Sequence, residues 1–264
     1  MPPQLNGETR LFPIFGDPIK YVESPVRFSR TLHDHGVNAL CVPMQVGTDG
    51  LGAVMAAFSA IANVDGLLVT MPHKGTSFAY CATTSERTQL LGVVSVMRRN
   101  TDGSWHGDML DGLAFVKAQV DHGARIEGAR ALLIGTGGAG SAIAIALVDA
   151  GVDELILHDV NRAKSAALLQ LLKARGANQV SIGSPDPTDC DLVFNATPMG
   201  MAEGDPIPLN IELLDSSMFV GDVIAGHGST PLIAAAEAAG CATANGGHMV
   251  EAVQQLMLDF MLGN

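Results

Sequence analysis

Residues 132–140 read Leu-Leu-Ile-Gly135-Thr-Gly137-Gly138-Ala-Gly140, an apolar strand pattern that runs into a G-x-G-x-x-G turn and then a helix of small residues. In this context the first glycine permits a tight turn, the second lets backbone approach a pyrophosphate, and the third lets the helix pack closely on the sheet. The helix amides attract the anion. The stretch predicts a Rossmann-type dinucleotide site, although a glycine-rich segment can also be merely a turn.

A second strand pattern, Leu155-Ile-Leu-His-Asp159, ends in an acid 19 residues after Gly140. A Rossmann domain places the carboxylate that binds the ribose 2′-hydroxyl at about this spacing. Such an acid repels a 2′-phosphate, so we expect NAD, with NADP as the alternative because Arg162 softens that preference. In the other interpretation, Asp159 is an ordinary loop acid.

Alternating apolar runs and helical patterns extend along the chain and predict an α/β fold with parallel strands. We expect residues 1–112 with 245–264 to form one domain, on which the last helix packs back, and residues 113–244 to form the dinucleotide-binding domain. Expected strands are 9–15, 39–44, 66–69, 93–97, 104–106, 130–134, 154–157, 192–194 and 218–222. Expected helices are one beginning near Ser24-Pro25, with Ser24 as its cap, and 51–61, 111–120, 142–150, 163–174, 231–239 and 248–261.

Composition narrows the functional classes. The 264 residues carry a formal net charge of −12, which disfavours binding to nucleic acid or to an anionic membrane surface. No run approaches the roughly 20 apolar residues of a membrane span, and no signal-peptide pattern precedes the first strand. The four cysteines form no C-x-x-C pair, so we expect neither a zinc site nor disulfides. We therefore expect a cytoplasmic protein without a metal. We also expect it to be a monomer or a homodimer.

Six motifs occur in order along the chain: Gly16-Asp-Pro-Ile19 with Ser24-Pro25, Val69-Thr-Met-Pro-His-Lys74, Gly107-Asp-Met-Leu-Asp111-Gly112, Gly135-Thr-Gly-Gly-Ala139, Asn195-Ala-Thr-Pro-Met-Gly200 and Thr230-Pro-Leu232. At this spacing the set resembles the shikimate dehydrogenase family, over nearly the whole chain. The resemblance implies an N-terminal α/β substrate-binding domain, a C-terminal Rossmann domain and a cleft between them. It also implies NAD(P)-dependent interconversion of a hydroxyl and a ketone on shikimate, quinate or a related cyclic hydroxy acid.

The resemblance assigns proton transfer to Lys74 and Asp111. Oxidation of an alcohol removes a hydride and a hydroxyl proton, and a positioned side chain must take the proton, while the cofactor supplies the redox chemistry. A lysine base must be partly neutral, which desolvation favours and an adjacent carboxylate opposes. Whether Lys74 is the base or a charged donor in a relay with Asp111 therefore stays open.

The resemblance also implies substrate-binding roles for Ser24, Thr70, Ser95 and Gln254. An alignment from Thr230 places Gln254 at the family's glutamine position, whereas one from Met249 places Val253 there. Several family polar positions differ here: a serine is Val22, two asparagines are Leu68 and Ser95, a polar pair is Met109-Leu110, and a tyrosine is Ala225. Lost hydrogen-bonding groups lower discrimination, which leaves a different, less polar hydroxy substrate as an alternative.

The motif and the resemblance together indicate the residues that face the cofactor: Gly135, Thr136, Gly137, Gly138, Ala139, Asp159, Arg162, Asn195, Thr197, Met199, Val223 and Gly247. A dinucleotide-binding sensor without turnover is the alternative from another functional class. The presence of both Lys74 and Asp111 favours an enzyme.

Overall fold

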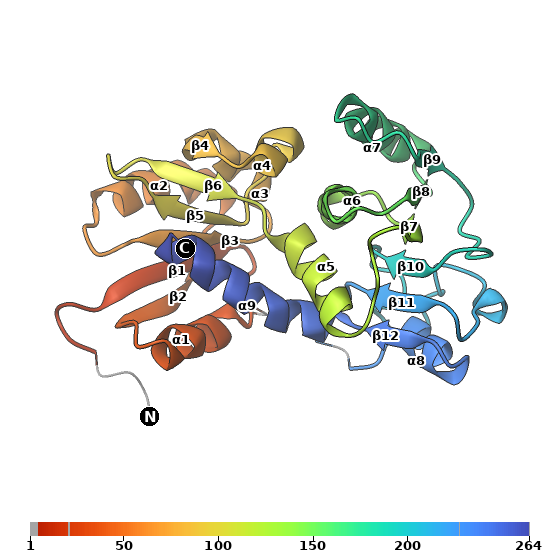
Figure 1. Ribbon diagram of the computed structural model, residues 1–264. Coiled ribbons are helices and arrows are strands. Elements are labelled where there is room, and N and C mark those ends of the chain that lie inside the picture. The colour runs from red at the N-terminus through yellow and green to blue at the C-terminus, as the bar shows by residue number, and fades with distance from the viewer. Residues whose placement is uncertain (1–4, 21, 227, 264) are drawn as a thin grey trace. The chain divides into compact units, whose positions relative to one another are not determined.

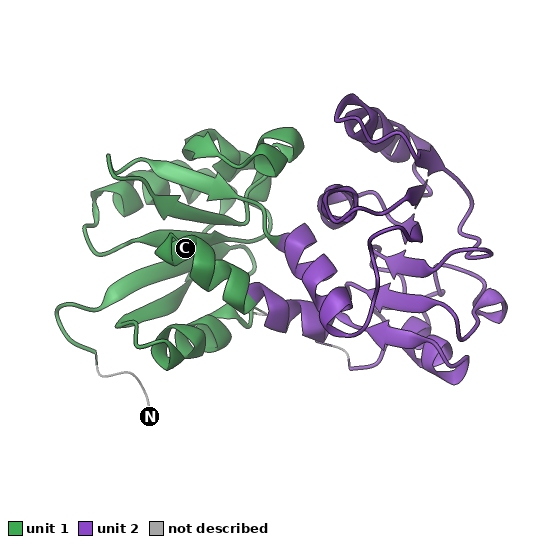
Figure 2. Cartoon of the chain, viewed as in Figure 1, with its two compact units in different colours: residues 1–110, 254–264 green, residues 111–253 purple. Residues whose placement is uncertain are grey.

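The computed structural model describes residues 5–20, 22–226 and 228–263. The chain forms two compact units, residues 1–110 with 254–264 (unit 1) and residues 111–253 (unit 2), as Figure 2 shows. Each unit is a sheet with its own helices (Figure 1). The predicted α/β class is confirmed. The predicted first boundary, after residue 112, lies two residues beyond the observed one, after residue 110. The predicted second boundary, before residue 245, lies nine residues ahead of the observed one, before residue 254, because the last helix begins in unit 2.

Unit 1 contains a six-stranded sheet in the order β2-β1-β3-β5-β6-β4. Because β1 pairs in parallel with β2 and β3, the carboxyl ends of these strands meet at one edge. The strands are β1 (Arg10–Gly16), β2 (Ala39–Gln45), β3 (Gly66–Val69), β4 (Cys81–Thr84), β5 (Val96–Arg99) and β6 (Trp105–Asp108), and the helices are α1 (Ser24–Asp34), η1 (Thr48–Gly50), α2 (Leu51–Ala60), α3 (Lys74–Ser77), η2 (Phe78–Tyr80) and α4 (Glu86–Leu91).

Two local expectations in unit 1 were wrong. The two strands expected at 93–97 and 104–106 are present, as β5 and β6, but their bounds lie later, because the backbone bond from the Asn100 amide to the Ser104 carbonyl (2.8 Å) closes the turn and antiparallel pairing continues up to it. Ser24 is not the cap of α1 but its first residue. Glu23 occupies the cap position, and it makes no capping hydrogen bond through its side chain.

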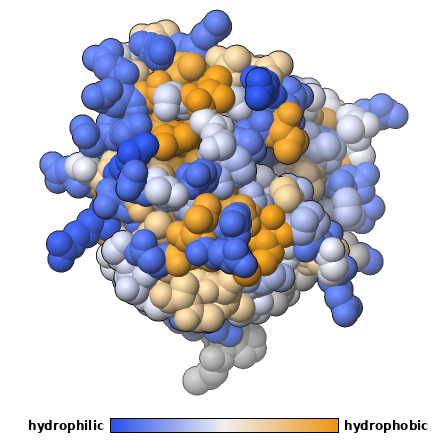
Figure 3. All heavy atoms as spheres, turned by 90° about the vertical axis from the view of Figure 1, so that its right-hand side faces the viewer, coloured by the Kyte–Doolittle hydropathy of each residue, from blue (hydrophilic) through white to orange (hydrophobic). Residues whose placement is uncertain are grey.

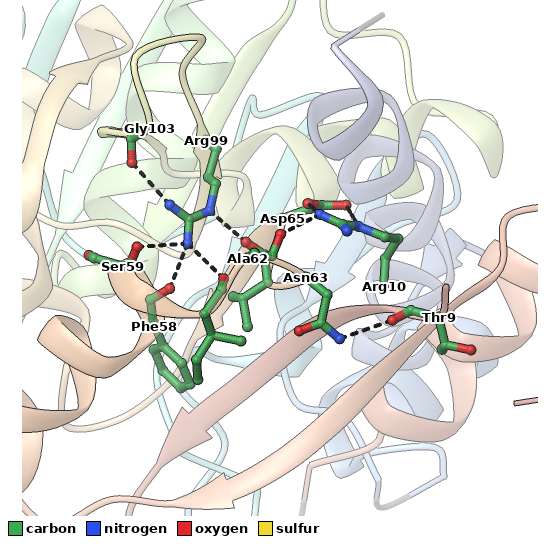
Figure 4. A network of polar contacts seen from close by, with 11 residues as sticks. Thr9, Arg10, Phe58, Ser59, Ala62, Asn63, Asp65, Arg99 and Gly103 are labelled. Atoms are coloured by element: carbon green, nitrogen blue, oxygen red, sulfur yellow. Dashed lines mark hydrogen bonds and ion pairs between the residues drawn. The ribbon is translucent and has the colours of Figure 1, made fainter. Parts of the chain in front are cut away.

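Two arginines stabilise the connection from α2 to β3 (Figure 4). The Arg99 guanidinium donates to the carbonyl oxygens of Phe58 (2.6 Å) and Ile61 (3.1 Å). Arg10 forms an ion pair with Asp65, just before β3. Since the last carbonyls of a helix have no partner within it, Arg99 satisfies the C-terminal end of α2 and fixes the path of the chain into the sheet.

Unit 2 contains a parallel sheet in the order β12-β11-β10-β7-β8-β9. The strand order reverses between β7 and β10, and in open α/β sheets ligands bind at the carboxyl ends beside such a switch point. The strands are β7 (Arg130–Ile134), β8 (Glu154–His158), β9 (Val180–Ile182), β10 (Leu192–Asn195), β11 (Phe219–Asp222) and β12 (Ala242–Ala244), and the helices are α5 (Asp111–Asp121), α6 (Gly138–Asp149), α7 (Arg162–Ala174), η3 (Ile211–Leu213), α8 (Pro231–Ala238) and α9 (Gly246–Leu262).

The chain crosses between the units at α5 and α9. Helix α5 begins at the first residue of unit 2, and α9 continues from unit 2 into unit 1 at Gln254. Near its end, α9 packs on the sheet of unit 1, because a Cβ built at Gly66 of β3 would collide with the Met261 sulfur. Gly66 thus lets the last turns of α9 approach β3 closely.

On the face drawn in Figure 3, apolar side chains form groups among hydrophilic ones. The described residues include exposed large hydrophobics such as Val160, Met201 and Leu213. None of the described helices combines the length and the apolar character that a membrane crossing requires.

Candidate active site

The glycine-rich turn follows β7 at the switch point of the unit 2 sheet. Gly135 has φ +99°, a conformation that favours glycine, and a Cβ there would lie 2.7 Å from the Ala196 carbonyl oxygen. A Cβ on Gly140 would overlap the Gly135 carbonyl group, so this glycine lets α6 pack against the turn. By contrast, a Cβ on Gly137 or Gly138 would meet nothing within 4 Å. The backbone thus borders open space at the second glycine, where a pyrophosphate would approach.

The N-terminus of α6 adds donors to that space. The helix begins at Gly138, and its cap residue, Gly137, offers no side chain to satisfy the first amides. These amides lie at the positive end of the dipole of a 12-residue helix. The cradle therefore fits a diphosphate held by backbone N–H groups.

Asp159 is turned toward the glycine-rich turn. Its Oδ2 accepts hydrogen bonds from the Thr136 amide (2.8 Å) and hydroxyl (3.0 Å), and its Oδ1 accepts one from the Asn161 amide (2.8 Å). Desolvation works to raise the pKa of Asp159, but these hydrogen bonds outweigh it and hold the pKa below its usual value. A carboxylate offers about four acceptor sites, so Oδ1 retains room for a ribose hydroxyl. Arg162 is the exposed first residue of α7, next to the cap residue Asn161.

Asn195 ends β10 and organises the loop after it. The side chain is fully buried and accepts hydrogen bonds from the Thr197 amide (3.0 Å) and hydroxyl (2.7 Å). Its Nδ2 donates to the Met199 carbonyl (3.3 Å) and to Asp222 (3.0 Å). Asn195 therefore holds the loop that carries Thr197 and Met199. The sequence pattern did not lead us to predict Asp222 as a site residue. Its position as an acid at the end of a strand was the signal that could have identified it.

Val223 and Gly247 come from neighbouring segments. A Cβ on Gly246 would lie 2.5 Å from the Val223 carbonyl oxygen, so the start of α9 packs against the backbone that follows β11. The Gly247 amide donates to Asn245 (2.9 Å). The structure thus brings together the regions of Val223 and Gly247 at one edge of unit 2.

Asp111 is the half-buried first residue of α5. At the next residue, Gly112, an added Cβ would overlap the carbonyl group of Ala142 on α6. Ala142 lies four residues after Gly138, about one helical turn from the start of α6. Asp111 therefore lies near the end of α6 that borders the pyrophosphate cradle.

Lys74 and Ser95 belong to unit 1. Half-buried Lys74 begins α3, and its carbonyl accepts a hydrogen bond from the Val94 amide (2.9 Å). The next residue, Ser95, is buried, and its hydroxyl accepts one from the Leu110 amide (2.9 Å). Because Asp111 follows Leu110, this chain of bonds ties the backbone at Lys74 to the residue directly before Asp111.

Thr70 follows β3, and its amide bonds to the Phe15 carbonyl at the end of β1 (3.1 Å). The Thr70 carbonyl accepts a bond from the His73 amide (2.9 Å), which places Thr70 in the turn that leads to Lys74. Ser24 is half-buried on α1, and Gln254 is buried on α9. Among the described residues, no hydrogen bond joins Ser24 to Thr70 or Ser95.

Comparison with known proteins identifies the family of this chain. A family model described as the shikimate dehydrogenase substrate binding domain matches residues 14–97. A shikimate dehydrogenase (NADP(+)) of Rubrobacter xylanophilus is 32% identical over 253 residues, which are 94% of this chain and 89% of that protein. The chain belongs to the shikimate dehydrogenase family. This confirms the resemblance found in the sequence, and members of the family are NAD(P)-dependent oxidoreductases.

Solved structures of the family share the fold. A shikimate 5-dehydrogenase from Listeria monocytogenes, in complex with shikimate and NAD, superposes with a TM-score of 0.92 at 24% identity, covering 99% of this chain and 94% of that one. A quinate dehydrogenase from Corynebacterium glutamicum, in complex with NAD, gives 0.87 at 24% identity, covering 97% and 94%. Within the described part of this family member, no cluster of three or more His, Cys, Asp or Glu side chains is arranged to hold a metal ion.

Proposed function

We propose that the protein is an NAD(P)-dependent dehydrogenase that interconverts a hydroxyl and a ketone on shikimate, quinate or a related cyclic hydroxy acid. The observation that carries the proposal is the position of Asp111, at the start of α5 and near the end of α6 that borders the pyrophosphate cradle. Asp111 directly follows Leu110, whose amide donates a hydrogen bond to the Ser95 hydroxyl in unit 1. Family membership at 32% identity supports the same activity.

In this proposal the dinucleotide is held by the backbone of residues 135–139 and by the loop that Asn195 organises. When bound, it supplies or accepts the hydride. Room on Asp159 Oδ1 for a ribose hydroxyl favours NAD. Use of NADP is supported by the relative named for NADP(+) and by Arg162 at the start of α7.

Lys74 and Asp111 handle the proton of the substrate hydroxyl. A positioned acid–base group contributes about 10²–10⁴-fold to such a step. Thr70 and Ser95 offer hydroxyls on the unit 1 segments that lead to Lys74 and to Asp111, and Ser24 and Gln254 complete the proposed substrate-binding set. We place this activity in the cytoplasm, where the four free thiols of the described chain would stay reduced.

The test is turnover of shikimate and quinate, followed by the absorbance of the reduced nicotinamide. Lys74→Ala should lower kcat at least about 100-fold and leave NAD affinity little changed. Lys117→Ala is the matched control, because that exposed lysine pairs with Asp121 on α5, and its rate should equal that of the wild type. A Lys74→Ala enzyme with an undiminished rate contradicts the proposal. A wild type that turns over neither acid favours a different, less polar hydroxy substrate. Binding of NAD without turnover of any hydroxy acid would instead indicate a sensor.

A further inference from the structure

Asp222, at the end of β11, is an acid buried completely in unit 2, with 0% of its surface exposed. Burial of a carboxylate costs free energy unless hydrogen bonds compensate. Oδ1 accepts bonds from Asn195 Nδ2 (3.0 Å) and the Ile224 amide (3.1 Å), and Oδ2 accepts one from the Thr230 hydroxyl (2.7 Å). Both carboxylate oxygens are therefore used.

These three partners belong to three segments at one edge of the sheet. Asn195 holds the loop after β10, Ile224 lies in the segment after β11, and Thr230 caps α8 by accepting a bond from the Ile233 amide (3.3 Å). Asp222 joins all three segments through one side chain. The same carboxylate thus couples the geometry of the loop, the segment and the helix.

The register places this network beside the glycine-rich turn. Asp222 pairs with Asn195, which pairs with Ile134, the residue before Gly135. Two strand spacings separate Asp222 from Ile134, about 10 Å. The adenosine ribose belongs on the opposite side, at the end of β8, where Asp159 lies. The β10–β11 side is then left for the nicotinamide half of the dinucleotide.

We propose that Asp222 is a positioning residue that sets the nicotinamide half of the cofactor cradle through Asn195, Ile224 and Thr230. This inference rests on the proposed function. It assigns Asp222 no contact with the substrate or the cofactor, because the side chain is turned into the protein. Its effect reaches the cofactor through the loops that it holds.

The position of Asp222 favours a group that accepts hydrogen bonds on both atoms. An amide of the same shape accepts on one atom only. In Asp222→Asn the NH₂ group either faces the donors Asn195 Nδ2 and the Ile224 amide, or lies beside the Thr230 hydroxyl, which must then accept a hydrogen bond in place of donating one. Burial raises the pKa of Asp222, against the opposing effect of these hydrogen bonds. The substitution therefore disturbs the network without a change of volume.

The test compares the affinities of wild type and Asp222→Asn for NAD and for ADP, which carries the adenosine and the pyrophosphate without the nicotinamide half. Loss of a hydrogen bond to a charged group predicts an affinity for NAD about tenfold lower. Affinity for ADP should be unchanged, and KM for NAD should rise more than KM for the ring acid. A purely structural role would lower the melting temperature but would not separate NAD from ADP.

Two controls keep the result interpretable. Asp191→Asn changes an exposed carboxylate beside the other end of β10, where Oδ2 accepts a hydrogen bond from the Arg130 amide (2.8 Å), and should alter neither affinity. Thr230→Ser keeps the hydroxyl and should bind NAD like the wild type, whereas Thr230→Val should reproduce the selective loss even if Asp222→Asn does not fold. Equal losses for NAD and ADP, or no loss, would overturn the inference while the proposed function stands. A wild type that binds no dinucleotide would overturn both.

Discussion

The two kinds of glycine in the turn after β7 should respond differently to alanine. At Gly140 the added Cβ would lie 2.8 Å from the Gly135 carbonyl carbon and nearer still to its oxygen, and both belong to backbone that cannot rotate away. Overpacking costs about 1–3 kcal/mol, and the rigid neighbour places this case near 3. The higher helix propensity of alanine returns about 1 kcal/mol. The net loss is about 2 kcal/mol, or about 4–8 °C in melting temperature for a protein of this size.

At Gly137 the same methyl group meets nothing within 4 Å, and φ is −73°, which alanine adopts without strain. Exchange of this cap glycine for alanine costs at most about 1 kcal/mol, so the melting temperature should fall by at most about 4 °C. The methyl group would, however, occupy the space proposed for the pyrophosphate. We expect affinity for NAD to fall about tenfold or more.

Thermal unfolding without ligand and calorimetric titration with NAD would measure the two effects separately. We predict that Gly140→Ala shows the larger thermal shift and that Gly137→Ala loses affinity for NAD with its fold intact. If Gly137→Ala bound NAD like the wild type, the open space beside this glycine would not be the pyrophosphate site. If Gly140→Ala melted like the wild type, the close packing of α6 on the turn would not constrain the fold.

Two further predictions concern ionisable groups. Asp159→Ala removes the carboxylate that excludes a 2′-phosphate, so the ratio of kcat/KM for NAD to that for NADP should fall, and an unchanged ratio would show that Asp159 does not face the ribose. The rings of His122 and His248 stack 3.7 Å apart, and desolvation, with a smaller contribution from His122 and against the opposing charge of Glu251, lowers the pKa of His248. Because the unfolded chain then binds this proton at higher pH than the folded one, the melting temperature should fall as the pH drops through about 6.5. The drop should be smaller in His248→Gln, and an equal drop in both proteins would contradict the assignment.

The amino-acid sequence by itself predicted the fold class, the family and the glycine-rich turn. These depend on local pattern, since strand β7, the turn and α6 are consecutive along the chain. Strands β3 and β7 lie within the ranges expected for them because turn residues and apolar runs bound them closely. Strands β4, β9 and β12 were not expected. They are three or four residues long, and their hydrogen bonds come from distant segments, which no local pattern encodes.

Only the tertiary structure decided the partners of the polar side chains. Asp159 was expected as a ribose ligand, yet its orientation depends on Thr136, 23 residues earlier in the chain. Asp222 carried no signal beyond its place at the end of a strand, and its importance comes from complete burial among Asn195, Ile224 and Thr230. Burial and hydrogen bonding arise when separate strands align, so they are properties of the packed sheet and its loops.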